Sequence, residues 1–194
     1  DDYITKPFDL EELKLRVKSA ITRATMQSLT NPTTGLPGGQ LIEDQLRQLM
    51  RQDEWGIVYA GIQRFDAFTD VYGFVAGEEV LRFMAMILGQ TVDDKGTAND
   101  FIGHVGNDDF IIITEKDLVG PIADELTQRF NKGIGTHYDW QTREQGYMVV
   151  QDDEDNEKKV ELMSLSIGLT TTDDGPFADI REITEVASSA RRGG

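Results

Sequence analysis

Hydrophobic residues recur with helical spacing in several stretches of the chain. The clearest case lies between residues 76 and 90, where Val80, Met84, Ile87 and Leu88 fall on one face of a helix. Spacing of this kind predicts helices over residues 9–29, 40–52, 64–72, 76–90, 117–132 and 178–191.

Short, nearly continuous apolar runs lie between these segments and are typical of buried strands. They cover residues 55–62, 101–105, 110–114, 146–150 and 160–170. A short turn containing Gly106 joins the second run to the third, and the polar segment QDDEDNEKK joins the fourth to the fifth. Each pair therefore predicts a hairpin. Because hairpins interrupt the alternation of strands and helices, we expect an α+β fold: a mainly antiparallel sheet with helices covering its faces.

The loop TNPTTGLPGG at residues 30–39 is the clearest boundary in the chain. In the predicted helix 9–29 before it, apolar residues step by three and four positions, as in a two-stranded coiled coil. These residues are Leu10, Leu13, Val17, Ala20 and Ala24. We expect a homodimer seam or a connecting stalk here; the alternative is an amphipathic helix that packs on its own domain.

Composition narrows the range of partners. The 194 residues carry a formal charge of −16 and 39% of them are hydrophobic, which is enough for a core. Such an acidic chain repels nucleic acids and anionic membrane surfaces, so we expect neither as a partner. The absence of cysteine excludes disulfides and thiolate metal sites. The chain shows neither a membrane-length apolar run nor a signal-peptide pattern, and we expect a cytoplasmic protein.

The turn at residues 106–109 carries the candidate chemistry. It places Asp108 beside Asp109, immediately before a strongly apolar strand. Paired carboxylates suit a hard cation such as Mg²⁺, but they are also ordinary solvated turn residues, and both interpretations stay open. His104 is expected to be a strand residue rather than a ligand. The acidic run at 152–157 lacks the glycine and glutamate spacing of an EF-hand loop, and we expect a solvated hairpin tip.

Several stretches, taken in order, resemble the GGDEF domain, the diguanylate cyclase family that condenses two GTP into cyclic di-GMP. NPTTGLPGGQLIEDQL at 31–46 is similar to the opening motif of the family, and IQRFDAFTDVYGFVAGEEVL at 62–81 to its nucleotide segment. VGNDDF at 105–110 stands where the signature pentapeptide belongs. LSIGL at 165–169 and ASSARRGG at 187–194 are similar to the late strand and the closing helix.

The start of the chain resembles the end of a response-regulator receiver domain, with its last strand, Lys-Pro loop and final helix. Lys6 then matches the lysine that contacts the phosphoryl group of a receiver. The resemblance implies that residues 1–30 are the end of a receiver and a linker helix, and that 31–194 are a GGDEF domain. It also implies an upstream receiver as a partner, and we expect the chain to be a fragment of a longer bacterial two-component signalling protein.

The resemblance places the metal ligands of the family on residues that have lost much of that chemistry. Nucleotidyl transfer uses divalent metals held by carboxylates. The two strand-end aspartates of the family fall on Gly61 and Gln63, leaving the backbone carbonyl of Ile62 and the side chain of Asp108. Asp109, the residual catalytic candidate, is one methylene shorter than the usual glutamate. We expect Mg²⁺ only if nucleotide is bound.

Nucleotide recognition is altered as well. Within the signature turn Gly106, Asn107, Asp108, Asp109 and Phe110, the asparagine replaces a glycine that approaches phosphate. The guanine-binding asparagine and aspartate of the family fall on Thr69 and Glu78, and the late lysine on Arg191. Asp66 reverses the charge of a lysine near the phosphates, and Phe74 replaces a histidine.

The product-inhibition motif Arg-x-x-Asp falls on Thr97 and Asp100, so its arginine is missing. We therefore expect weak or no feedback binding of cyclic di-GMP. Together these residues predict a degenerate, catalytically inactive GGDEF domain that forms the output part of a response regulator. It would act through an unidentified signalling protein or through residual GTP binding. The alternative is an active diguanylate cyclase with relaxed metal ligation.

Overall fold

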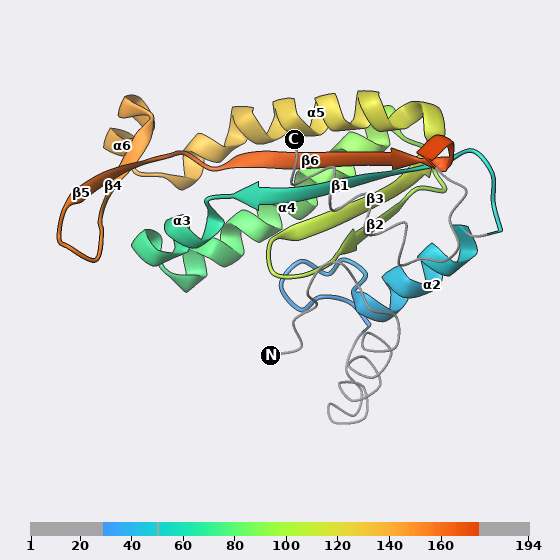
Figure 1. Ribbon diagram of the computed structural model, residues 1–194, viewed down its shortest axis with the longest axis horizontal. Helices are drawn as coiled ribbons and strands as arrows, with labels where there is room; N and C mark the ends of the chain where they lie inside the picture. The colour runs from blue at the N-terminus through green and yellow to red at the C-terminus, as the bar shows by residue number, and fades with distance from the viewer. Residues whose placement is uncertain (1–28, 50, 175–194) are drawn as a thin grey trace.

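The structure is a computed structural model and describes residues 29–49 and 51–174 (Figure 1). Its elements are α2 (Gly39–Leu49), β1 (Trp55–Gln63), α3 (Phe65–Tyr72), α4 (Phe74–Lys95), β2 (Phe101–His104), β3 (Asp109–Glu115), η1 (Lys116–Leu118), α5 (Val119–Gly133), η2 (Ile134–His137), α6 (Trp140–Gln145), β4 (Tyr147–Gln151), β5 (Glu157–Glu161), β6 (Ser164–Thr171) and η3 (Thr172–Asp174). Residues 9–28 of the predicted helix 9–29, the predicted helix 178–191 with its Arg191, and Lys6 lie outside the described residues.

A four-stranded antiparallel sheet in the order β2-β3-β1-β6 forms the centre of the fold. Strand β1 is flanked by β3 and β6, and all eight of its first residues are buried. Its near-continuous apolar sequence fits a strand that is covered on both faces. The predicted α+β class, with a mainly antiparallel sheet flanked by helices, is confirmed.

Alternate residues of β1 and β3 face two different hydrophobic clusters. Val58 and Ile112 pack into the larger cluster with α4 and α5, whereas Ile57 and Ile111 pack into a smaller cluster with α2. Figure 1 shows α4 and α5 on one side of the sheet and α2 on the other. Because successive side chains of a strand point to opposite faces of the sheet, each position in these strands faces one cluster or the other.

The predicted hairpin of residues 146–150 with 160–170 is wrong in its second strand. Strand β5 pairs with β4 in a separate two-stranded sheet, and β6 pairs with β1. Leu162 and Met163 separate the two strands. The Leu162 carbonyl accepts a hydrogen bond from Arg64 Nε (3.1 Å), and the Met163 N–H donates to the Tyr138 hydroxyl (2.8 Å). Side chains thus replace a strand partner at this point, and a continuous ladder cannot form.

Helix boundaries differ from the predicted ones by a few residues. Helix α4 begins earlier than expected because Gly73, with φ of 95°, ends α3 and allows α4 to start directly at Phe74, and it continues beyond its predicted end to Lys95. Helix α6 has no counterpart in the prediction. It is held locally, because Asp139 accepts a hydrogen bond from the Thr142 N–H (2.8 Å) and Gly146, with φ of 84°, ends the helix. Six residues are too few for a periodic hydrophobic signal.

None of the helices in the described part of the chain is long and apolar enough to cross a membrane.

Candidate functional site

The register of the central sheet brings the end of β1 next to the turn between β2 and β3. Gly61 is the direct partner of Asp109 in the β1–β3 ladder. One residue on, the Ile62 N–H donates a hydrogen bond to the Asp108 carbonyl (3.1 Å). The positions that sequence comparison assigns to metal binding are therefore neighbours in space.

Gly61 and Asp109 face the same side of the sheet as α2. Directly opposed positions of an antiparallel pair place their Cβ atoms about 5 Å apart, so a carboxylate at position 61 would lie beside that of Asp109. Asp109 itself is only 3% exposed, whereas Asp108 is half-buried and Asn107 is exposed. Where Gly61 pairs with Asp109, strand β3 thus contributes a carboxylate, and strand β1 contributes only backbone.

The donor set does not fit a divalent cation. Gln63, at the second strand-end position, is exposed, and its Oε1 accepts a hydrogen bond from Ser164 Oγ (3.0 Å). Among the described residues no group of three or more acidic, histidine or cysteine side chains converges as a metal site would require. Hard cations need several oxygen ligands with matching charge, and this corner supplies too few.

His104 fastens the signature turn to the loop before α2. Its Nε2 donates to the Asn107 carbonyl (2.9 Å), so its Nδ1 accepts from the Thr34 hydroxyl (3.0 Å) in the neutral imidazole. The ring stacks on Phe110 with 4.3 Å between centroids. Burial lowers the pKa of His104, although the bond to the Asn107 carbonyl acts in the opposite direction. His104 lies in β2, as predicted.

The residues that correspond to guanine recognition are engaged within the protein. Thr69 donates from its hydroxyl to the Asp66 carbonyl (2.9 Å) and turns its methyl group toward Gly77. Glu78 accepts from the Thr33 hydroxyl (3.3 Å) in the loop before α2. The threonine at position 69 has no side-chain amide. An amide is the group that reads a base edge with both a donor and an acceptor.

The residues at the inhibition motif also have internal partners. Asp100 accepts hydrogen bonds from the Thr97 backbone N–H (3.0 Å), the Thr97 hydroxyl (2.7 Å) and the Thr114 hydroxyl (2.9 Å). This carboxylate therefore fastens the loop after α4 to β3.

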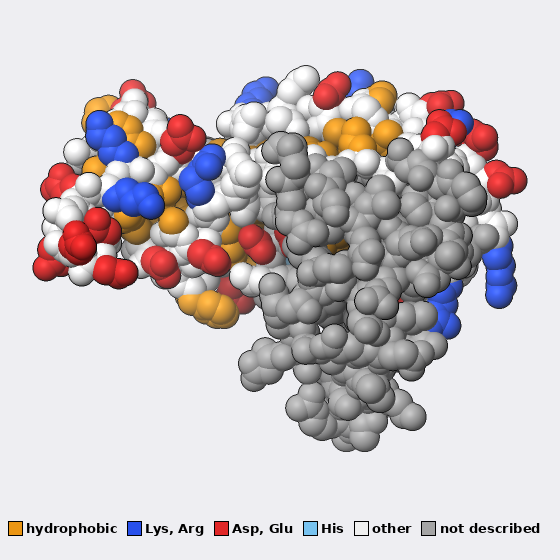
Figure 2. All heavy atoms as spheres, viewed as in Figure 1, with side chains coloured by type: hydrophobic (Ala, Val, Ile, Leu, Met, Phe, Trp, Pro, Cys, Tyr) orange, Lys and Arg blue, Asp and Glu red, His pale blue; other side chains and the backbone are white. Residues whose placement is uncertain are grey.

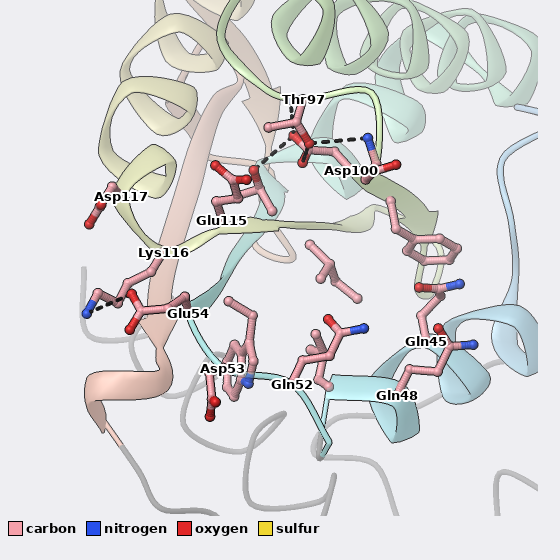
Figure 3. A pocket seen from close by; sticks show the side chains of 16 residues that line it. Gln45, Gln48, Gln52, Asp53, Glu54, Thr97, Asp100, Glu115, Lys116 and Asp117 are labelled. Atoms are coloured by element: carbon pink, nitrogen blue, oxygen red, sulfur yellow. Dashed lines mark hydrogen bonds and ion pairs between the residues drawn. The ribbon is translucent and has the colours of Figure 1, made fainter.

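Thr97 and Asp100 line a cavity of about 650 Å³, shown in Figure 3. Gln45 and Gln48 of α2, with Gln52 after it, lie across from them. The cavity is at the Trp55–Glu115 end of the β1–β3 ladder, whereas the signature turn is at the Gly61–Asp109 end. This cavity is thus separate from the corner formed by Gly61 and the signature turn.

Comparison with known proteins decides the family. The model for "Diguanylate cyclase, GGDEF domain" matches residues 28–143. The chain belongs to the GGDEF family. Diguanylate cyclase DgcZ of Escherichia coli (strain K12) is 31% identical over 94 residues, which is 47% of this chain and 30% of DgcZ. The chain therefore aligns with less than a third of that relative's length.

Solved structures agree with the GGDEF fold. Diguanylate cyclase SiaD in complex with its activator SiaC, from Pseudomonas aeruginosa, superposes with a TM-score of 0.63 at 14% identity, covering 95% of this chain and 64% of SiaD. The GGDEF domain of DgcB from Caulobacter crescentus, in complex with c-di-GMP, gives 0.60 at 17% identity, covering 87% and 92%. At these identities the likeness shows the fold.

Sequence reasoning missed two residues of the opening motif whose side chains hold the site. Thr33 and Thr34 contact Glu78 and His104 from the loop before α2. The only signal was the Thr-Thr pair inside a Pro/Gly loop, where short hydroxyl side chains are common for local reasons.

Proposed function

We propose that this chain is the output part of a response regulator whose GGDEF domain makes no cyclic di-GMP and acts in signal transduction by binding a protein partner. The observation that carries the proposal is Gly61 opposite Asp109. The family places a metal-binding carboxylate at that position, and glycine supplies none.

The physical argument is the charge available at the reacting phosphate. Attack of a ribose hydroxyl on an α-phosphorus needs metal ions, or equivalent positive charge, to offset the developing negative charge. Asp108, Asp109 and the Ile62 carbonyl are the remaining metal-binding positions. Loss of a ligand from such a set costs orders of magnitude in rate.

Changes at positions that lie near the nucleotide in the family support the same conclusion. Asp66 introduces a negative charge where the family has a lysine near the phosphates, and repulsion weakens anion binding. Asn107 adds a side chain where glycine allows close backbone approach. Residual GTP binding, with Mg²⁺ carried by the nucleotide, is a weaker form of the proposal and involves Thr69, Glu78 and Arg191.

The test is cyclic di-GMP formation. Concentrated protein is incubated with GTP and Mg²⁺ or Mn²⁺, and products are separated by chromatography, with an active diguanylate cyclase in parallel. We expect product only from the control enzyme, and calorimetry with GTP then separates a nucleotide sensor from a protein-binding domain. Product from the native chain that disappears in Asp108→Ala would overturn the proposal.

The second candidate is an active diguanylate cyclase. It is favoured by Asp108 and Asp109, which keep both signature carboxylates in type. It predicts turnover without any change at Gly61. Pairing of two chains through residues 9–29, controlled by an upstream receiver, belongs to both candidates and is tested by the oligomeric state of the longer protein.

A further inference from the structure

The elbow between α3 and α4 exposes three neighbouring apolar side chains. Phe74, Val75 and Val71 are 76%, 65% and 49% exposed. In α3 the residues that face the core are Phe65 and Phe68, both buried. Gly73, with φ of 95°, then turns the chain before the first turn of α4. We call Val71, Phe74 and Val75 the elbow patch.

The elbow patch is costly for an isolated domain. Burial of a Phe or Val side chain contributes about 1.5–3 kcal/mol, and these residues forgo most of it. Single exposed apolar residues are normal, but a contiguous group marks an interaction surface. Folding provides no reason for the patch, because the interior of α3 and α4 is already filled by other residues of the larger cluster.

Acidic side chains precede and follow the elbow patch along α3 and α4, between Arg64 and Arg82. Residues 65–81 contain no lysine, arginine or histidine, whereas Asp66, Asp70, Glu78 and Glu79 all lie within this segment. Glu78 and Glu79 come one helical turn after Phe74 and Val75, which makes them neighbours on the surface of α4. Figure 2 shows hydrophobic side chains at the lower left edge of the molecule, beside acidic ones.

We propose that the elbow patch binds an amphipathic segment of a partner protein whose apolar side chains are flanked by lysine or arginine. Apolar anchors supply affinity, and a basic rim meets the acidic rim of the patch. A second copy of this chain, at −16, and an anionic membrane surface both repel the same rim. This inference rests on the proposed function only in naming the surface through which the domain would signal.

A direct test uses a fluorescein-labelled helical peptide of leucine and lysine, with leucine at helical spacing, as the probe. Anisotropy titration of the full chain is expected to show saturable binding that weakens with added salt. A peptide with glutamate in place of lysine is expected not to bind. Equal binding of both peptides, or binding that does not saturate, would overturn the proposal.

Matched variants locate the binding surface. Phe74→Ser with Val75→Ser is expected to weaken the Leu/Lys peptide at least about tenfold. Met86→Ser, which removes another exposed apolar residue of α4 (53% exposed), is expected to change binding less than about twofold. Asp70→Lys with Glu79→Lys should weaken binding far more than the equal charge change Asp93→Lys with Asp124→Lys. Equal effects within the first pair would show that the apolar residues of the elbow are not the binding site, equal effects within the second would show that the binding follows net charge, and either result would overturn the proposal.

Self-association is the competing outcome. With p-benzoylphenylalanine at position 74, irradiation in the host cell should crosslink the chain to a protein segment rich in apolar and basic residues. The Asp70→Lys and Glu79→Lys changes should reduce that adduct. An adduct formed only with a second copy of the chain overturns the proposal. Turnover of GTP is measured separately, so failure here and failure of the proposed function give different results.

Discussion

A Cβ atom on Gly77 of α4 would lie 2.5 Å from Cγ2 of Thr69 in α3. The two helices therefore approach each other through a glycine and a methyl group, and this contact fixes the Thr69 side chain.

The first prediction concerns that contact. Gly77→Ala is expected to destabilise the domain by about 1–2 kcal/mol, because overpacking costs about 1–3 kcal/mol and the gain in helix propensity offsets part of it. Thr69→Ser removes the opposing methyl and is expected to rescue Gly77→Ala. Urea unfolding of the two single variants and the double variant measures the coupling.

Gly89→Ala is the matched control, because it lies in the same helix and its Cβ would meet nothing within 4 Å. We expect it to stabilise the domain by about 0.5–1 kcal/mol. If Gly77→Ala and Gly89→Ala behave alike, the close approach at Thr69 has no energetic consequence.

A second prediction tests the missing carboxylate. Gly61→Asp places a carboxylate beside Asp109 and is expected to raise affinity for Mn²⁺ at least about tenfold, since two adjacent charges attract a cation more strongly than one. Titration followed by electron paramagnetic resonance measures it. Gly61→Asn has nearly the same size without the charge and should leave affinity unchanged. Wild-type affinity equal to that of Gly61→Asp would contradict our interpretation of this position.

A third prediction concerns pH. Burial lowers the pKa of His104 in the folded state, so the unfolded chain binds a proton more readily. The stability of the neutral, buried form is fully present above the unfolded pKa of about 6.5 and is lost as pH falls through the lower folded pKa. Protonation of His104 Nδ1 also removes the acceptor of the hydrogen bond that the Thr34 hydroxyl donates.

We therefore expect the free energy of unfolding to fall between pH 6.5 and 5, by at most about 1.4 kcal/mol per pH unit for one proton. Chemical denaturation of the wild type and of His104→Gln measures the difference, and the variant should show the shallower slope. His137→Gln is the control, because burial also lowers the pKa of His137. In His137→Gln, the slope of the free energy of unfolding against pH should still contain the contribution of His104. Identical slopes for wild type and His104→Gln would contradict the assignment.

The long elements could be predicted because their patterns are strong. Strand β1 and helix α4 carry many apolar residues with a clear period; β1 differs from its predicted bounds by one residue, and α4 contains the whole of its predicted segment. The break between β5 and β6 could not be predicted, because it depends on Arg64 and Tyr138, which are distant in sequence. Local patterns do not report such long-range hydrogen bonds.

The candidate site was located by its motifs, and the register of β1 and β3 places Gly61 beside Asp109. The motifs could not show which hydrogen-bond partners each side chain has. Glu78 accepts a hydrogen bond from Thr33, and Asp100 accepts one from Thr114, and neither bond can be read from the motifs. Residue type indicates which chemistry a position can perform, but its hydrogen-bond partners determine whether the group is available.

The last prediction uses Asp100 and Thr97. In the wild type the Thr97 hydroxyl occupies Oδ1 of Asp100, and Thr114 holds Oδ2. We expect calorimetric titration of the wild type with cyclic di-GMP to show heat of dilution only. Thr97→Arg removes that hydroxyl, frees one carboxylate oxygen and supplies a planar guanidinium that can bind phosphate in a bidentate manner, so measurable binding should appear. Thr97→Lys supplies the same charge without the planar fork and should bind more weakly. Binding by the wild type, or equal binding by the two variants, would show that recognition here does not depend on an arginine at position 97.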